Sequence, residues 1–200
     1  MQTEILALSD PEAEPRAEDL LRAGGLVALP TETVYGLAGD SASGTAVAGI
    51  FAAKGRPRFN PLICHVDSIE MARRTGLFDD VAAALAATFW PGPLTLVVPL
   101  APDAPVHPLA TAGLATVAIR LPRGVAARLA GRLGRPIVAP SANPSGRVTG
   151  TSAEAALRGL SGRIPLILDA GPSPIGVESI IVRPEGGRLD LLRAGAISRD

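Results

Sequence analysis

Apolar residues recur along the chain with two spacings, one typical of strands and one typical of helices. Short apolar runs bounded by Gly, Pro or polar residues predict strands, and apolar residues three and four positions apart predict helices. The predicted strands are residues 5–8, 26–29, 62–66, 94–99, 116–121, 137–139, 166–168, 179–182 and 189–192. The predicted helices are residues 12–23, 45–54, 68–74, 79–89, 125–133 and 153–160.

The order of these segments predicts an α/β fold with one mixed sheet. Strands alternate with helices through most of the chain, whereas segments 179–182 and 189–192 can pair directly across a turn at residues 184–187. The polar segment 30–37 follows the buried strand 26–29, and we expect that strand to end there in a turn. The length of 200 residues fits a single domain spanning residues 1–200.

Composition and charge limit the classes of function. Hydrophobic residues make up 47% of the chain and charged residues 19%, as in ordinary globular proteins. The 19 acidic and 19 basic residues balance, so any contact with RNA has to be local. The single cysteine, Cys64, excludes a disulfide framework and a cysteine-rich zinc site. Neither a signal peptide pattern nor an apolar run of roughly 18 residues is present, so we expect a cytoplasmic protein without membrane contact.

The segment 54–61 gathers residue types that are rare elsewhere in the chain. Lys54 is the only lysine, and Asn60 and Asn143 are the only asparagines. One ammonium and two guanidinium groups lie close together here between Gly and Pro, so they can form a compact site for an anion such as phosphate. A solvated basic turn that caps the preceding helix explains the same residues. The segment by itself leaves both interpretations open.

Several familiar catalytic motifs are missing from the sequence. There is neither a G-x-x-x-x-G-K-[ST] phosphate loop nor a G-x-G-x-x-G fingerprint, so a nucleotide would be held in another way. The two histidines, His65 and His107, are too few for a metal cluster, and Ser141 lacks the elbow motif of a hydrolase. Cys64 and His65 are neighbours in a predicted strand and therefore point to opposite faces, which excludes a Cys-His catalytic pair.

Seven short sequence blocks occur in a fixed order along the chain. They are Pro30-Thr31-Glu32-Thr33-Val34-Tyr35-Gly36-Leu37, Lys54-Gly55-Arg56, Asn60-Pro61-Leu62, Trp90-Pro91-Gly92-Pro93, Ala118-Ile119-Arg120, Ser141-Ala142-Asn143 and Leu192-Arg193-Ala194-Gly195. With these blocks the chain resembles the YrdC-like family of threonylcarbamoyl-AMP synthases over about residues 12–198. Seven blocks in order are far more specific than any one of them.

The resemblance implies a fold, an activity and partners. The implied fold is a twisted mixed β-sheet flanked by helices around a large concave basic cavity. The implied enzyme is a nucleotidyltransferase that joins L-threonine, bicarbonate (as carbon dioxide) and ATP into threonylcarbamoyl-AMP and pyrophosphate, with Mg²⁺ accompanying the ATP. A downstream threonylcarbamoyl-transferase complex would then modify tRNA, and a weak contact between this chain and tRNA or double-stranded RNA is compatible with that role.

The same resemblance, carried over position by position, implies the residues of the site. Lys54 and Arg56 are expected to neutralise the charge that grows on the phosphates as pyrophosphate leaves. The residues expected to bind L-threonine are Thr33, His65, Arg120 and Ser179. The residues expected to bind ATP are Arg56, Asn60, Thr116, Ser141, Asn143, Thr149 and Arg193. No metal ion held by the protein itself is expected.

Each residue expected to bind threonine also has a plain structural interpretation. The alternatives are a strand position for Thr33, a core position for His65, a surface ion pair for Arg120 and a turn for Ser179. Thr116 and Thr149 could contact a ligand through their backbone alone. The joint placement of these residues at strand ends, where ligand crevices form in α/β sheets, favours function for most of them.

The chain departs from the family pattern in two places and at its end. Ile180 stands where Thr is frequent, and Ala194 stands where Pro is frequent, which leaves the position of the last strand pair open. The sequence also ends at Asp200, so we expect it to lack the C-terminal domain of longer members, whether naturally or by truncation.

Two other functions are compatible with such a fold. A related domain occurs in the large carbamoyltransferases of hydrogenase maturation, but a 200-residue chain has no room for their additional modules. A concave basic surface could also serve as an RNA-binding module, although the zero net charge and an aromatic content of 3% argue against it.

Overall fold

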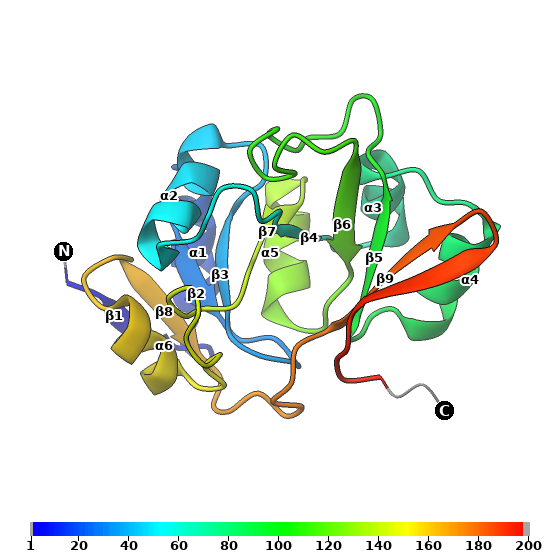
Figure 1. Cartoon of the computed structure of the whole chain (residues 1–200). Coiled ribbons are helices and arrows are strands. Elements are labelled where there is room, and N and C mark those ends of the chain that lie inside the picture. Colours follow the sequence, from blue (N-terminus) through cyan, green and yellow to red (C-terminus); the bar gives the residue numbers. More distant parts are fainter. Residues whose placement is uncertain (1, 198–200) are drawn as a thin grey trace.

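A computed structural model describes residues 2–197 as a long, strongly twisted sheet with helices packed against it (Figure 1). The strands are β1 (Glu4–Ala7), β2 (Val27–Leu29), β3 (Gly36–Asp40), β4 (Ile63–His65), β5 (Leu94–Pro99), β6 (Thr116–Arg120), β7 (Ile137–Val138), β8 (Leu166–Asp169), β9 (Ile180–Glu185) and β10 (Arg188–Arg193). The helices are α1 (Ala13–Arg22), α2 (Gly44–Lys54), α3 (Ile69–Thr75), α4 (Asp80–Phe89), α5 (Val125–Leu133) and α6 (Ala153–Leu160).

The sheet is mixed, as the order of elements predicts. Its strands lie in the order β1-β8-β2-β3-β7-β4-β6-β5-β9-β10. The pairs β1/β8, β2/β8, β4/β6 and β5/β9 are parallel, and the remaining neighbours are antiparallel. The short strand β7 joins the two parts of the sheet, because it pairs with β3 on one side and with β4 on the other.

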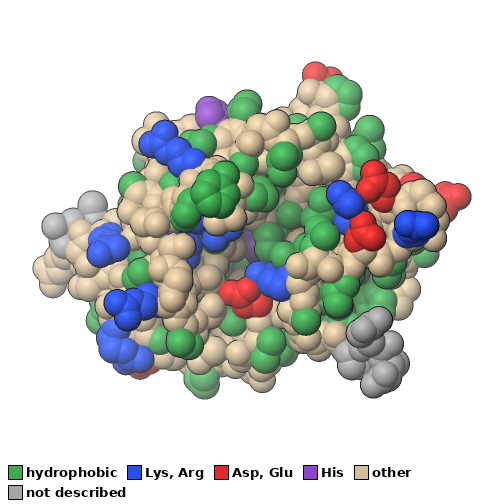
Figure 2. All heavy atoms as spheres, in the orientation of Figure 1, with side chains coloured by type: hydrophobic (Ala, Val, Ile, Leu, Met, Phe, Trp, Pro, Cys, Tyr) green, Lys and Arg blue, Asp and Glu red, His purple; other side chains and the backbone are tan. Residues whose placement is uncertain are grey.

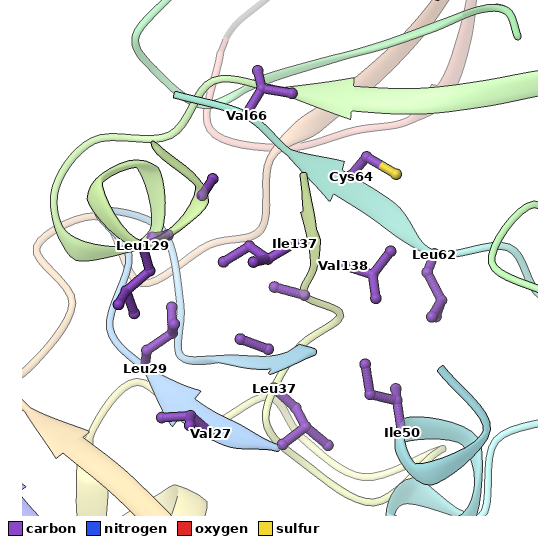
Figure 3. Close-up of a cluster of buried hydrophobic side chains, with 14 of the residues drawn as sticks. Val27, Leu29, Leu37, Ile50, Leu62, Cys64, Val66, Leu129, Ile137 and Val138 are labelled. Carbon is purple, nitrogen blue, oxygen red and sulfur yellow. The ribbon is translucent and has the colours of Figure 1, made fainter. Parts of the chain in front are cut away.

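The core is built from aliphatic side chains of both the sheet and the helices. Figure 3 shows side chains of β2, β3, β4, β7, α2 and α5 meeting in one cluster, in which Leu29, Leu37, Leu129 and Ile137 are fully buried. Burial of a Leu or Ile side chain stabilises a fold by about 1.5–3 kcal/mol, so this cluster supplies much of the free energy that holds the strand ends in place.

Four of the helices are capped at their N-terminus by a hydroxyl or carboxylate side chain. Ser43, Ser68, Asp79 and Ser152 each accept a hydrogen bond from a backbone N–H in the first turn of α2, α3, α4 and α6. Such a cap contributes about 1 kcal/mol, and it fixes where each helix starts. None of the helices within residues 2–197 is both long and apolar enough to cross a bilayer.

Strand β2 ends in a turn within residues 30–37 as expected, but strand β3 was not predicted. The bend lies at residues 32–34, and the chain then returns antiparallel to β2 through Gly36–Asp40. Glycine is unfavourable in strands, but a Cβ at Gly39 would stand 3.1 Å from Ile50 Cδ1 and 3.2 Å from Leu26 Cδ2. The small residue therefore allows α2 to pack closely on this central strand, a tertiary reason that the local sequence does not reveal.

The C-terminal hairpin forms as expected but with a tighter turn. Strand β9 continues through Pro184 to Glu185, β10 starts at Arg188, and the loop is only Gly186-Gly187. Both glycines have positive φ, at 56° and 78°, which is the conformation that a two-residue hairpin turn requires. Figure 1 shows this hairpin extending from one end of the sheet.

Candidate active site

The ends of several strands surround a cavity of about 170 Å³ near the middle of the sheet. Figure 2 shows a recess on this face where basic, acidic and histidine side chains meet. The residues that line the cavity are Thr33, Val34, Arg56, Pro61, Ile63, His65, Arg120, Ala139, Pro140, Ser141, Glu178, Ser179, Ile181 and Arg193. The structure therefore brings together all four residues expected to bind threonine, and Arg56, Ser141 and Arg193 of those expected to bind ATP.

Arg120 is the most enclosed cation of the cavity. Its side chain is 4% exposed, its Nε donates to Gly92 O at 3.1 Å, and its Nη1 donates to Thr33 Oγ1 at 2.9 Å. Its Nη2 lies 2.8 Å from Glu32 Oε1. Burial lowers the pKa of this guanidinium, and the Glu32 carboxylate acts in the opposite direction. Each of the three guanidinium nitrogens thus has a partner in the protein, and Arg120 also lines the cavity.

The hydroxyl of Thr33 has a fixed orientation. Thr31 Oγ1 donates to Val34 O at 2.7 Å, so Thr31 can only accept at its contact of 2.9 Å with Thr33 Oγ1. Thr33 therefore donates its proton to Thr31 and accepts from Arg120. One lone pair of Thr33 remains for a donor on a ligand, such as an amine or carbamate N–H.

His65 is neutral and presents a hydrogen-bond acceptor. Its Nδ1 lies 3.3 Å from Ile63 O, which only an Nδ1–H can satisfy, and this leaves Nε2 with a lone pair. Burial, together with the positive charge of Arg120, lowers the pKa of His65 to about 3. The neighbouring Cys64 is buried in the core, so the two side chains lie on opposite faces of β4 as predicted.

Ser179 and Arg193 are joined where β9 begins and β10 ends. Arg193 Nη2 donates to Ser179 Oγ at 2.9 Å, and Thr95 Oγ1 lies 2.8 Å from the same hydroxyl. Arg193 also forms an ion pair with Glu178, whose other oxygen accepts from Thr149 Oγ1 at 3.0 Å. This network fixes the last strand pair against the cavity.

Arg56 differs from the other two arginines of the cavity. Its Nε donates to Asn60 O at 3.3 Å and its Nη2 to Pro61 O at 3.1 Å, so both partners are neutral backbone carbonyls. No carboxylate within residues 2–197 forms an ion pair with it, whereas Arg120 and Arg193 each have one. Arg56 is therefore the cavity arginine whose charge is most available to an anion, and Asn60 contributes its carbonyl to holding it.

Lys54 lies behind the cavity rather than in its wall. Its side chain is buried, and its ammonium donates to Ser141 O, to Asn143 O and, at 3.4 Å, to Asn143 Oδ1. Burial, with a smaller effect of Arg56, lowers the pKa of Lys54 to about 8. Asn143 Nδ2 donates to Arg147 O at 2.6 Å. Lys54 and Asn143 thus hold the loop that presents Ser141, which is a role the sequence did not indicate.

Thr149 and Thr116 have different surroundings. Thr149 is tied to Glu178 at the edge of the cavity. Thr116 lies at the start of β6 and pairs with Pro99, at the opposite end of that strand from Arg120, and it does not line the cavity.

Three supporting residues were not predicted from the sequence. Glu32 and Glu178 pair with arginines that are distant along the chain, and such pairs leave no local pattern. The Tyr35 hydroxyl lies 2.8 Å from Gly171 O and so anchors the segment that leads to Glu178. The only usable signal was the position of Glu32 and Tyr35 inside the first of the seven sequence blocks.

A larger hollow elsewhere lacks these features. It measures about 660 Å³ and is lined mainly by residues of β1 and α1. Its charged side chains, such as Arg16 and Glu4, already pair with each other at 2.7 Å and are exposed. Within the described part of the chain, no group of three or more His, Cys, Asp or Glu side chains is placed to hold a metal ion.

Comparison with known proteins agrees with the fold. A family model for Sua5, YciO and YrdC, described as telomere recombination, matches residues 19–195. A threonylcarbamoyl-AMP synthase of Bacillus subtilis is 46% identical over 99% of this chain and 57% of its own length. A crystal structure of Pyrococcus abyssi Sua5 complexed with L-threonine superposes with a TM-score of 0.90 and 42% identity, over 96% of this chain and 58% of the other.

A shorter protein shares the fold across its length. Escherichia coli YciO superposes with a TM-score of 0.84 over 96% of both chains, at 19% identity, which compares the folds alone. The chain spans little more than half the length of the B. subtilis synthase and of P. abyssi Sua5. The matched residues and the identities nevertheless leave one conclusion: the chain belongs to the Sua5/YciO/YrdC family.

Proposed function

We propose that the chain forms threonylcarbamoyl-AMP from L-threonine, bicarbonate and ATP, with release of pyrophosphate. The observation that carries the proposal is that one cavity is lined by two kinds of group. Neutral hydrogen-bonding groups accompany the enclosed Arg120, and the same cavity is lined by Arg56, which has no carboxylate partner among the described residues. An amino acid and a polyphosphate need these two environments.

The amino-acid side of the cavity offers complementary partners to threonine. Arg120 lines the cavity and can bind a carboxylate there, and the lone pairs of Thr33 and His65 can accept from N–H and O–H groups. Ser179, held between Thr95 and Arg193, adds a further polar contact. Because His65 is neutral, threonine binding should not require its protonation near pH 7.

The nucleotide side is formed by Arg56, Ser141 and Arg193. Negative charge grows on the departing pyrophosphate, and a fixed guanidinium beside it stabilises the transition state. Mg²⁺ would arrive as part of the MgATP substrate, because Glu178, the one carboxylate among residues 2–197 that lines the cavity, is already paired with Arg193. Magnesium usually keeps several waters and binds through substrate phosphates.

The wider role is part of the same proposal. Threonylcarbamoyl-AMP is an activated mixed anhydride, so a second enzyme has to accept its threonylcarbamoyl group, and we propose a tRNA-modifying transferase complex. A weak contact of this chain with tRNA, and a location in the cytoplasm, also belong to the proposal; the single buried Cys64 suits a reducing compartment.

The decisive experiment follows pyrophosphate release. The chain is incubated with MgATP, bicarbonate and one amino acid at a time, with carbamoyl phosphate as a separate arm. We expect release with L-threonine and little with serine, valine or D-threonine. Release that depends on carbamoyl phosphate instead, or that is indifferent to the amino acid, would contradict the proposal.

A further inference from the structure

Glu32 is a buried acid that lies beside the cavity without lining it. Its side chain is 9% exposed, and its Oε1 stands 2.8 Å from Arg120 Nη2. Its Oε2 accepts from the backbone N–H of Arg123 at 3.2 Å, just before α5. The carboxylate thus connects the end of β6, which carries Arg120, with the start of the following helix.

The ion pair between Glu32 and Arg120 is close but imperfectly aligned. Glu32 Oε1 and Arg120 Nη2 are both buried and lack a well-angled hydrogen-bond partner among the described residues. The other guanidinium nitrogens of Arg120 have such partners, Nε in Gly92 O and Nη1 in Thr33 Oγ1. Nη2 is therefore held by charge attraction to Glu32 more than by hydrogen-bond geometry, and it is closed off from solvent.

A buried guanidinium needs a counter-ion to keep its place. Moving a charge out of water costs several kcal/mol unless an opposite charge lies nearby, so an Arg120 without Glu32 would turn toward solvent or draw water into the cavity. Among the described residues the cavity offers no second free acid for this purpose, since Glu178 is engaged by Arg193. The position of the Arg120 fork thus depends on one carboxylate.

We propose that Glu32 is a positioning residue, whose carboxylate holds the Arg120 guanidinium in the orientation in which it binds the carboxylate of the amino-acid substrate. The inference rests on the proposed function, because it assumes that threonine binds at Arg120. Glu32 does not itself touch the substrate. Its backbone carbonyl, which accepts from Ile175 N at 3.0 Å, fixes the main chain on the other side.

The test is Glu32→Gln, which keeps the shape and an acceptor for Arg123 N–H but removes the charge. We expect the threonine KM to rise about tenfold or more, while kcat and the ATP KM change less than about twofold. Thermal unfolding checks that the variant is folded. Glu18→Gln is the matched control, because Glu18 pairs with Arg22 and Arg132 on the surface, and its threonine KM should equal that of the wild type.

A double-variant cycle separates positioning from a general structural role. If Glu32 acts through Arg120, then Glu32→Gln combined with Arg120→Lys should bind threonine no worse than Arg120→Lys alone. Additive losses, or a lowered melting temperature with an unchanged threonine KM, would overturn the proposal. If Glu32→Gln does not fold, the double variant Glu32→Gln/Arg120→Gln, which removes both charges, is compared with Arg120→Gln. A weaker affinity for threonine in the double variant than in Arg120→Gln would also overturn the proposal.

The proposed function is judged separately by the wild type. Threonine-dependent pyrophosphate release by the unmodified chain supports the function, whatever Glu32 does. If the wild type binds threonine and releases pyrophosphate but Glu32→Gln has an unchanged threonine KM, only the positioning role is wrong.

Discussion

Side chains of the cavity are arranged as charge pairs and hydrogen-bonded chains rather than as free groups. Arg120 and Arg193 each face a carboxylate, and Thr33 and Ser179 are each oriented by a neighbouring hydroxyl. Arg56 lacks such an acid among the described residues. At this scale the sequence identified the polar residues that converge on the cavity, but not the acids that hold them, because neither Glu32 nor Glu178 is spaced from its arginine by a helix or strand repeat that would reveal the pair.

His65 should make the fold sensitive to acid. Its pKa is about 3 in the folded chain and near 6.5 when unfolded, so below pH 6.5 only the unfolded chain takes up the proton. Stability from this group is complete above pH 6.5 and is lost as the pH falls toward 3, by about 2 kcal/mol at pH 5. We expect that in His65→Asn the free energy of unfolding, measured with denaturant, falls less steeply between pH 6.5 and pH 3 than in the wild type.

The wild-type chain, measured at the same pH values, supplies the reference for that experiment. An equally steep loss in His65→Asn would show that His65 is not the group responsible.

Single positions also decide how whole elements approach each other. The glycine-containing strand β3 and the two-residue turn of the β9–β10 hairpin were not fully predicted, because close packing and turn type are tertiary properties. The starts of α2, α4 and α6 were predicted well, since the capping residues Ser43, Asp79 and Ser152 lie directly before them in the sequence. Elements with a local cause could be predicted, and those fixed by a distant neighbour could not.

Gly195 should be essential for the position of the Ser179 segment. A Cβ at Gly195 would stand 2.3 Å from Ile180 N and 2.5 Å from Glu178 O, and neither backbone atom can yield without moving β9. We expect Gly195→Ala to lower kcat/KM at least tenfold. Gly49→Ala in α2 is the control, because its Cβ would meet Leu26 Cδ1 at an ordinary contact distance of 3.4 Å, and alanine stabilises a helix by about 1 kcal/mol relative to glycine. Similar activities of the two variants would refute the steric argument.

Lys54 should support the Ser141 loop through its hydrogen bonds to two carbonyls of that loop. Hydrogen bonds to charged groups contribute about 1.5–3 kcal/mol each, so Lys54→Met is expected to lower both the melting temperature and the affinity for ATP, while threonine affinity changes little. Calorimetry with each ligand measures the two affinities. Arg56→Met is the comparison, since it should lower ATP affinity and turnover with a smaller change in melting temperature than Lys54→Met. A larger fall in melting temperature for Arg56→Met than for Lys54→Met would contradict the supporting role of Lys54.

The molecule as a whole places its cavity across the joint between the two parts of the sheet. Thr33 lies between β2 and β3 on one part, and His65, Arg120 and Ser179 come from β4, β6 and the start of β9 on the other. Strand β7 links the parts with only two registered pairs on each side. A ligand in the cavity therefore connects segments that the backbone joins through one short strand.

Ligand binding should accordingly raise the thermal stability of the whole chain. At a threonine concentration about one hundred times the Kd, binding adds about 2.7 kcal/mol. For a chain of this size that corresponds to roughly 5–10 °C in the melting temperature. Differential scanning calorimetry with L-threonine measures the shift, and D-threonine at the same concentration should give none. A shift of equal size with both enantiomers would mean that binding outside the cavity is being measured.

The turn at Trp90–Pro93 gives the chain a built-in optical probe. Trp90 is the single tryptophan, it is buried against Phe78, and its indole N–H donates to Leu94 O at 2.7 Å. Two residues further on, Gly92 O accepts a hydrogen bond from Arg120 Nε, so one short turn links the indole of Trp90 to the guanidinium of the cavity. Its emission wavelength and quenching should therefore report the arrival of an amino acid at Arg120 without any label, and stopped-flow fluorescence of the unmodified chain can time that step before a phosphate bond is broken.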